Sequence, residues 1–160
     1  MARSRVQTGR YTAEIDDDFV VFLIGIRINK LWKIHKWIGP FFSMPRMLRE
    51  LRLHPDKGML GARIALGGRT FTVVQYWRSF DQLEAFAKNP NDPHLPAWKA
   101  FNKKVGTSGD VGVYHETYRV GAGRHESIYS NMPVMGLAAA GRSVVVGKRS
   151  ETARASIARQ

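Results

Sequence analysis

Histidine is the residue type in this chain best suited to acid–base or metal chemistry, because the sequence contains no cysteine. Disulfides, thiolate nucleophiles, iron–sulfur clusters and thiolate-bound haem are therefore excluded. The five histidines are His35, His54, His94, His115 and His125, and no two of them have the spacing of a metal motif such as HExxH. A metal would have to be held by histidine, carboxylate or tyrosine.

His115 is the strongest single candidate for chemistry. It lies in DVGVYHETYRV, an alternating segment over 110–120 that predicts a strand. The alternation places His115 on one face with Thr117 and Glu116 on the other, so this pair does not form a His–Glu dyad. A neutral imidazole there could coordinate iron or accept a proton. The alternative is a core histidine bonded to a backbone carbonyl.

A second polar candidate and four aromatic residues complete the predicted site. Asn131 precedes Met-Pro and could orient a substrate carbonyl or a bound oxygen; the alternative is that its side chain stabilises the turn. The residues expected to contact a substrate are Tyr76, Trp98, Phe101 and Tyr129, although core packing is the usual role of such aromatic side chains.

Other catalytic frameworks lack their motifs. The sequence has no GxSxG elbow, no Walker loop and no GxGxxG after a predicted strand. The pattern therefore favours neither a hydrolase nor a nucleotide-binding fold.

The elements that must position these residues follow from hydrophobic patterning. Pro40 and Pro45 are expected to break the region 31–52 into two short helices. The pair Gly67-Gly68 predicts a hairpin. Ser79 is expected to cap the helix that follows it. We expect strands over 19–28, 58–66, 70–77 and 110–120, helices over 79–88 and 97–105, and a short further strand within 125–131.

This order of elements is that of the ferredoxin-like split β-α-β motif, an α+β fold with an antiparallel sheet. Both helices would cover one face of the sheet, yet segment 19–28 is apolar on both sides. Burying the second face favours a homodimer, a dimeric α+β barrel, or a filled cavity. We expect one such domain over 11–140, a flexible basic N-terminus over 1–10 and a flexible basic tail over 141–160.

The formal net charge of +12 would suit a nucleic-acid partner, but its distribution argues against one. The segments 1–10 and 141–160 together hold a net seven of these charges, and no recognised nucleic-acid-binding motif accompanies them. We therefore expect no nucleic acid as a partner. The strongest apolar run is too short for a membrane span and the N-terminus lacks a signal peptide, so we expect a cytoplasmic location.

Several sequence elements resemble a known family over about 18–141. They are YW-S-F-LEAFA, H-PAW-AFN, G-VG-YHETY-V and YSNMP-GL. These elements are similar to the bacterial family that groups with a fungal polyketide monooxygenase of fumagillin biosynthesis, the af470-like monooxygenases. The resemblance implies a dimeric α+β barrel of the kind found in antibiotic-biosynthesis monooxygenases.

A more distant resemblance is to haem-containing aldoxime dehydratases. Their barrel carries an axial histidine before a glutamate late in the sheet, and His115-Glu116 matches that position. The resemblance implies haem b as a cofactor. Asn131 stands where those enzymes have a second histidine that acts as an acid, which argues against the dehydratase reaction itself.

The sequence thus predicts a monooxygenase-like oxidoreductase that acts on a small hydrophobic or aromatic compound. Two routes remain open: a haem held by His115 with Asn131 on its open side, or no cofactor, with His115 as the base and the protein supplying desolvation and orientation. The alternative function is a non-catalytic protein that binds haem or another small ligand on the same scaffold.

Overall fold

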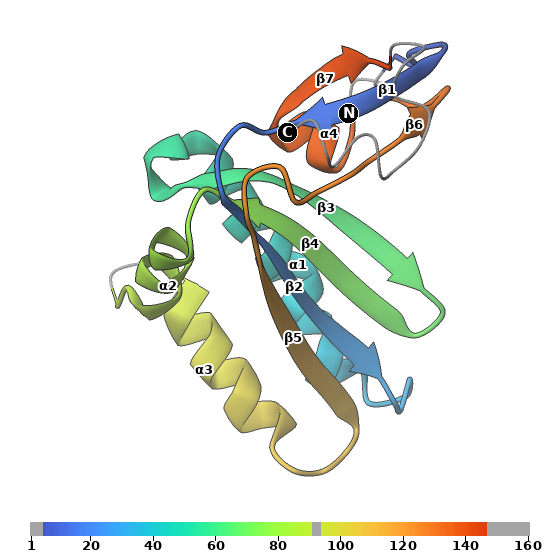
Figure 1. Ribbon diagram of the computed structural model, residues 1–160. Coiled ribbons are helices and arrows are strands. Elements are labelled where there is room, and N and C mark those ends of the chain that lie inside the picture. The colour runs from blue at the N-terminus through green and yellow to red at the C-terminus, as the bar shows by residue number, and fades with distance from the viewer. Residues whose placement is uncertain (1–4, 91–93, 147–160) are drawn as a thin grey trace.

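The computed structural model describes residues 5–90 and 94–146, which form two antiparallel sheets with helices packed against the larger sheet (Figure 1). The elements are β1 Arg10–Glu14, β2 Phe19–Ile28, α1 Ile34–Leu53, the 3-10 helix η1 Pro55–Lys57, β3 Met59–Gly67, β4 Thr70–Trp77, α2 Phe80–Lys88, α3 His94–Val105, β5 Val111–Val120, β6 Tyr129–Ser130, α4 Leu137–Ala140 and β7 Arg142–Val145. None of these helices is both long and apolar enough to cross a membrane.

The larger sheet has the strand order β3-β4-β2-β5. Strand β2 is central and pairs with β4 on one side and β5 on the other. Strands β3 and β4 form the expected hairpin, and Gly68 adopts a φ of 56° at its turn. This order confirms the ferredoxin-like α+β fold that the sequence predicts.

The three longer helices cover one face of this sheet, and the strand register shows which residues that face carries. Ile24 lies opposite Val73 on one side and His115 on the other, so all three share the face that the helices cover. The core on this face includes Val20, Ile26, Val73 and Trp77 from the strands and Leu48, Leu51, Leu83, Phe86, Phe101 and Val105 from the helices.

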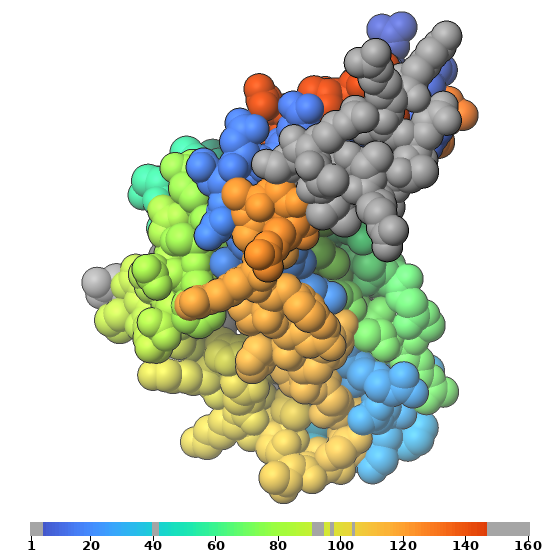
Figure 2. Space-filling model, viewed as in Figure 1, coloured from blue at the N-terminus to red at the C-terminus, as the bar shows by residue number. Residues whose placement is uncertain are grey.

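The opposite side of the sheet, called the open face below, has no layer of long helices. It carries Val21, Leu23, Gly25, Arg63, Thr72, Val74, Tyr76, Tyr114, Glu116 and Tyr118. Helix α4 contacts β3 and closes the end of the open face around Tyr76. Toward β5 this face is left open: Tyr118 is 52% exposed, and in Figure 2 the orange surface of β5 and the loop after it meets solvent.

A smaller sheet, ordered β6-β1-β7, joins the two ends of the described chain beside α4 (Figure 1). Residues 142–145, which the sequence predicts to belong to a flexible basic tail, instead form β7 and pair with β1. Arg142 lies 3.4 Å from Glu14 and 3.2 Å from Asp16, so its charge is matched by carboxylates. The strand expected within 125–131 is only Tyr129–Ser130, and it also pairs with β1.

The expected break in the first helical region does not occur. Helix α1 runs continuously from Ile34 to Leu53 through both prolines. Proline costs a helix one backbone hydrogen bond and adds a steric clash. Burial of Leu48 and Leu51 against the sheet offsets that cost, since Leu51 has no exposed surface and Leu48 is only 5% exposed.

Gly25 has no room for a side chain. A Cβ atom at this position would overlap the Tyr114 ring and lie 2.9 Å from the backbone oxygen of Phe71. We expect Gly25→Ala to lower the free energy of unfolding by about 1–3 kcal/mol through overpacking. Urea denaturation at a fixed protein concentration measures this change. Gly67→Ala is the control, because nothing lies within 4 Å of a Cβ atom there; equal losses for both variants would contradict the account.

Candidate functional site

The open face carries polar side chains among half-buried apolar ones. Val21, Leu23 and Val74 are half-buried and form an apolar floor. The Thr72 hydroxyl on β4 and the Tyr114 hydroxyl on β5 form a hydrogen bond of 2.5 Å across β2, which lies between these two strands. Such a surface can hold an apolar molecule and direct its oxygen atoms through a few hydroxyl groups.

Three residues from different strands converge where α4 meets this face. They are Arg63 from β3, Tyr76 from β4 and Tyr129 from β6, called the Arg63 cluster below. Arg63 lies close enough to the Tyr76 hydroxyl to lower the pKa of Tyr76 through its positive charge and through hydrogen bonding. A side chain added at Gly136 would lie 3.0 Å from the Tyr129 hydroxyl and 3.6 Å from the Tyr76 hydroxyl, so both hydroxyls border one backbone position.

Burial controls the chemistry of Tyr76. Its side chain is only 9% exposed, and this desolvation raises the pKa of its hydroxyl above the ordinary value for tyrosine. The nearby positive charge and hydrogen bond of Arg63 act in the opposite direction. The cluster therefore combines a neutral phenol donor with a cation, which suits the binding of a negatively charged oxygen.

Tyr129 is fixed from the other side by backbone. Its hydroxyl accepts hydrogen bonds from the backbone amides of Leu137, at 3.1 Å, and Ala138, at 3.4 Å. Gly136, just before them, has a φ of 60°, a region that favours glycine. The turn into α4 thus sets the position of Tyr129 beside Tyr76.

Tyr118 and Glu116 form a separate pair on the edge strand β5 of the open face. The Tyr118 hydroxyl donates a hydrogen bond to Glu116 Oε2 at 2.7 Å. This hydrogen bond to the carboxylate raises the pKa of Tyr118. Glu116 therefore faces away from His115, as the strand alternation predicted.

His115 lies on the helix side of the edge strand β5. Its ring centroid is 6.1 Å from that of Phe22, and its side chain is exposed. Within the described part of the chain no group is hydrogen-bonded to the imidazole, so the structure does not show the core histidine bonded to a carbonyl. An accessible, unbonded imidazole remains available as a base or an axial ligand.

Asn131 lies in the small sheet, away from His115. Its side-chain oxygen accepts a hydrogen bond from the backbone N–H of Gly9 at 3.0 Å. The backbone N–H of Asn131 in turn donates to the backbone carbonyl of Gly9 at 3.0 Å. Its φ of 53° marks a tight turn. In this geometry Asn131 stabilises the turn, and the structure does not bring it to the same face as His115.

The four predicted aromatic residues divide between the two faces. Tyr76 and Tyr129 meet in the Arg63 cluster on the open face. Trp98 and Phe101 lie together on α3, with ring centroids 5.7 Å apart, and Phe101 belongs to the helix-side core. Sequence reasoning missed Arg63. The signal for it was a single cation inside the otherwise apolar segment MLGARIAL.

Two clefts of the described residues lie elsewhere. One, of about 350 Å³, is bordered by the end of α1, by β3 and by α4. The other, of about 240 Å³, lies between the start of β2, the end of β5 and the start of α2. None of the six predicted site residues lines either cleft. The described residues also contain no cluster of three or more histidine or carboxylate side chains that could hold a metal ion.

A protein-family model matches most of the described chain. The model of the family described as Monooxygenase af470-like matches residues 19–137, from the first residue of β2 to the first residue of α4. The chain belongs to the af470-like monooxygenase family. The match confirms the resemblance seen in the sequence, and it contains His115, Asn131 and the whole Arg63 cluster. No curated protein matches this chain.

One solved structure shows the same fold at low sequence identity. The crystal structure of an aldoxime dehydratase is 18% identical with a TM-score of 0.63, covering 92% of this af470-like chain and 44% of that chain. The chain thus spans less than half of the dehydratase, and the likeness shows the fold alone. Two further structures have TM-scores below 0.5. A possible oxidoreductase of unknown function from Bacteroides thetaiotaomicron is 14% identical with a TM-score of 0.37, covering 66% of this chain and 99% of that chain. A protein from Shewanella oneidensis is 14% identical with a TM-score of 0.42, covering 74% of this chain and 99% of that chain.

The Arg63 cluster makes a prediction about titration. Because Arg63 opposes the effect of burial, Arg63→Gln should raise the pKa of Tyr76 further above its ordinary value. NMR titration of tyrosine ζ-carbons measures the change, and Tyr76→Phe assigns the signal. Arg69→Gln is the matched control, because Arg69 donates to the Asn29 carbonyl at the distant hairpin. A Tyr76 signal that titrates alike in wild type and Arg63→Gln would contradict the cluster.

Proposed function

We propose that this af470-like chain is an oxidoreductase of the monooxygenase type that oxidises a small hydrophobic or aromatic compound on the open face. The observation that supports this proposal is the convergence of Arg63, Tyr76 and Tyr129 above a half-buried apolar floor. The cluster offers a cation and hydroxyl groups to one oxygen of a ligand. A phenol or enol is the substrate class that combines such an oxygen with an apolar body.

The protein would promote oxidation by stabilising negative charge on the substrate. Arg63 and Tyr76 would bind the phenolate or enolate oxygen, which makes the carbon framework electron-rich and reactive toward dioxygen. In the simplest balanced reaction, an activated CH₂ group becomes a carbonyl: one atom of O₂ enters the product, and the other leaves as water with both hydrogens. The substrate then supplies all the electrons.

A second copy of the chain would close the site. The part of the open face beyond the cluster around Tyr76 carries Leu23, and Tyr118 on the edge strand β5 is 52% exposed. Burial of apolar surface contributes about 25 cal/mol per Å², and exclusion of water strengthens the electrostatic effect of Arg63. We therefore propose a homodimer in which two open faces meet and enclose the substrate.

A haem held by His115 is the second candidate, and the accessible, unbonded imidazole favours it. Phe22 and Ile24 share its face and are half-buried apolar side chains that suit a porphyrin edge. When bound, haem supplies activation of oxygen at its iron. His115 would hold it from the helix side of β5, and that side is separate from the Arg63 cluster.

Oxygen consumption tests the first proposal. Anthrone is a suitable probe, because its enol form is a phenol and its CH₂ group can become the second carbonyl of anthraquinone. We expect wild-type protein to accelerate oxygen uptake and anthraquinone formation, and Arg63→Gln to lower the enzymatic rate by about 100-fold, as loss of one oxyanion donor typically does. Arg69→Gln should retain the rate. Full activity of Arg63→Gln would contradict the role of the cluster, whereas wild-type binding without turnover would support the non-catalytic alternative.

Haem titration tests the second candidate. If haem binds through histidine, the Soret band of the loaded protein should be lost or shifted in His115→Ala. His54→Ala is the matched control, since His54 is also exposed and is paired with Glu50 at 3.1 Å. Absence of a Soret band in wild type, or an unchanged band in His115→Ala, would remove this candidate.

A further inference from the structure

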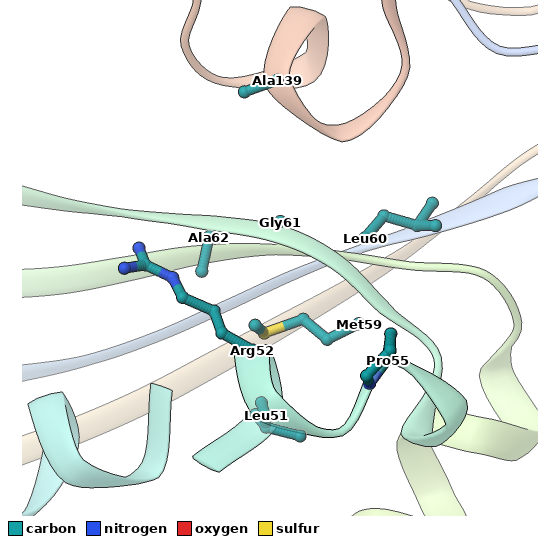
Figure 3. Close-up of a pocket in the computed structure, with 8 residues that line it drawn as sticks. All are labelled: Leu51, Arg52, Pro55, Met59, Leu60, Gly61, Ala62 and Ala139. Atoms are coloured by element: carbon teal, nitrogen blue, oxygen red, sulfur yellow. The ribbon is translucent and has the colours of Figure 1, made fainter. Parts of the chain in front are cut away.

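The 350 Å³ cleft beside β3 is not part of the site described above. Figure 3 shows its walls: Leu51 and Arg52 at the end of α1, Leu60 and Ala62 on β3, and Ala139 on α4. Its size is at the lower end of the range for ligand pockets, about 300–1,000 Å³. The cleft is therefore large enough for a small organic molecule.

None of the three residues of the Arg63 cluster lines this cleft. Ala62 pairs with Gln75 and faces the helix side, whereas Arg63 pairs with Val74 and faces the open side. Adjacent residues of a strand point to opposite faces. The cleft itself extends around the edge of the sheet, because Gly61 pairs with Tyr76 and α4 lies on the open side. Arg63, Tyr76 and Tyr129 are nevertheless absent from its lining, so the cleft is a separate site.

Most of the residues that line the cleft are apolar. Leu51 has no exposed surface, Met59 is only 8% exposed, and Leu60 and Ala62 are half-buried. Ala139 has a small, exposed side chain and borders the cleft from α4, across β3 from Leu51 and Arg52 (Figure 3). These walls can contact a short hydrocarbon chain without leaving polar groups of the ligand unpaired.

Arg52 gives the cleft one positive charge. It is the only charged residue that lines the cleft among the described residues, and no described carboxylate pairs with it. The acids nearby are already engaged: Glu50 lies 3.1 Å from His54 and 3.7 Å from Lys57, and Asp56 lies 4.0 Å from His54. The charge of Arg52 is therefore available to an anionic ligand.

We propose that this cleft binds a small amphiphilic carboxylate, whose chain lies against Leu51, Leu60 and Ala62 and whose carboxylate pairs with Arg52. The fork of guanidinium N–H groups matches a carboxylate in two-point hydrogen bonding. This site goes beyond the proposed oxidation, because it requires neither the Arg63 cluster nor oxygen.

Octanoate binding to the full chain tests the proposal, measured by calorimetry and by methyl NMR shifts. We expect octanoate to bind and to shift the methyl signals of Leu51, Leu60 and Ala139. Octanamide, its uncharged counterpart, should bind about fivefold more weakly, and Arg52→Gln should weaken octanoate binding by a similar factor, as expected for one partly exposed ion pair. Ala139→Trp should abolish binding by filling the cleft.

Matched variants make the result decisive. Arg49→Gln removes the same charge from an exposed position on the same helix outside the cleft, and it should leave octanoate affinity unchanged. Circular dichroism verifies that Ala139→Trp is folded. The proposal is overturned if millimolar octanoate does not bind, or if octanamide binds with the same affinity as octanoate. It is also overturned if Arg52→Gln and Arg49→Gln change octanoate affinity equally, or if folded Ala139→Trp binds octanoate as tightly as the wild type. None of these outcomes depends on whether the chain oxidises anthrone.

Discussion

The four-stranded sheet has two faces with apolar side chains, but its long helices cover only one. The covered face holds the main core, in which Trp77, Val73 and Leu51 have no exposed surface. The other face is apolar at Val21, Leu23 and Val74 yet has only α4 and the small sheet against one end. Because burial of apolar surface is the main driving force of folding and association, covering the remaining part of that face would be favourable, which is the basis of the proposed homodimer.

The partial cover also explains where the polar chemistry lies. Helix α4 and β6 bring Tyr129 to the border of the open face, where it meets Tyr76 and Arg63. A polar cluster placed at the edge of an apolar floor binds a ligand that has the same division between an apolar body and one charged oxygen. The helix side of β5 presents a different group, the unbonded imidazole of His115. Strand alternation alone keeps these two chemistries on opposite sides.

Long elements with strong patterns could be predicted from the sequence. The order of the four main strands is as expected. Ser79 caps α2, since its hydroxyl accepts a hydrogen bond from the backbone N–H of Gln82 at 3.2 Å. Strands β1 and β7 could not be predicted, because each is short and gains its stability from pairing with a distant partner. Helix α1 continues through its prolines because tertiary burial outweighs local propensity. Aromatic character indicated Tyr76 and Tyr129, but only the register of β3 against β4 places Arg63 beside them.

The account depends on closure of the open face by a second copy, and sedimentation equilibrium tests this most directly. Leu23→Asp introduces a charge on the open face, whereas Leu66→Asp introduces one at an exposed position on the helix side of β3. The account predicts a dimer for wild type and Leu66→Asp at micromolar concentration, and a folded monomer for Leu23→Asp. A compact monomer for the wild-type chain, or a dimer that Leu23→Asp leaves intact, would contradict it.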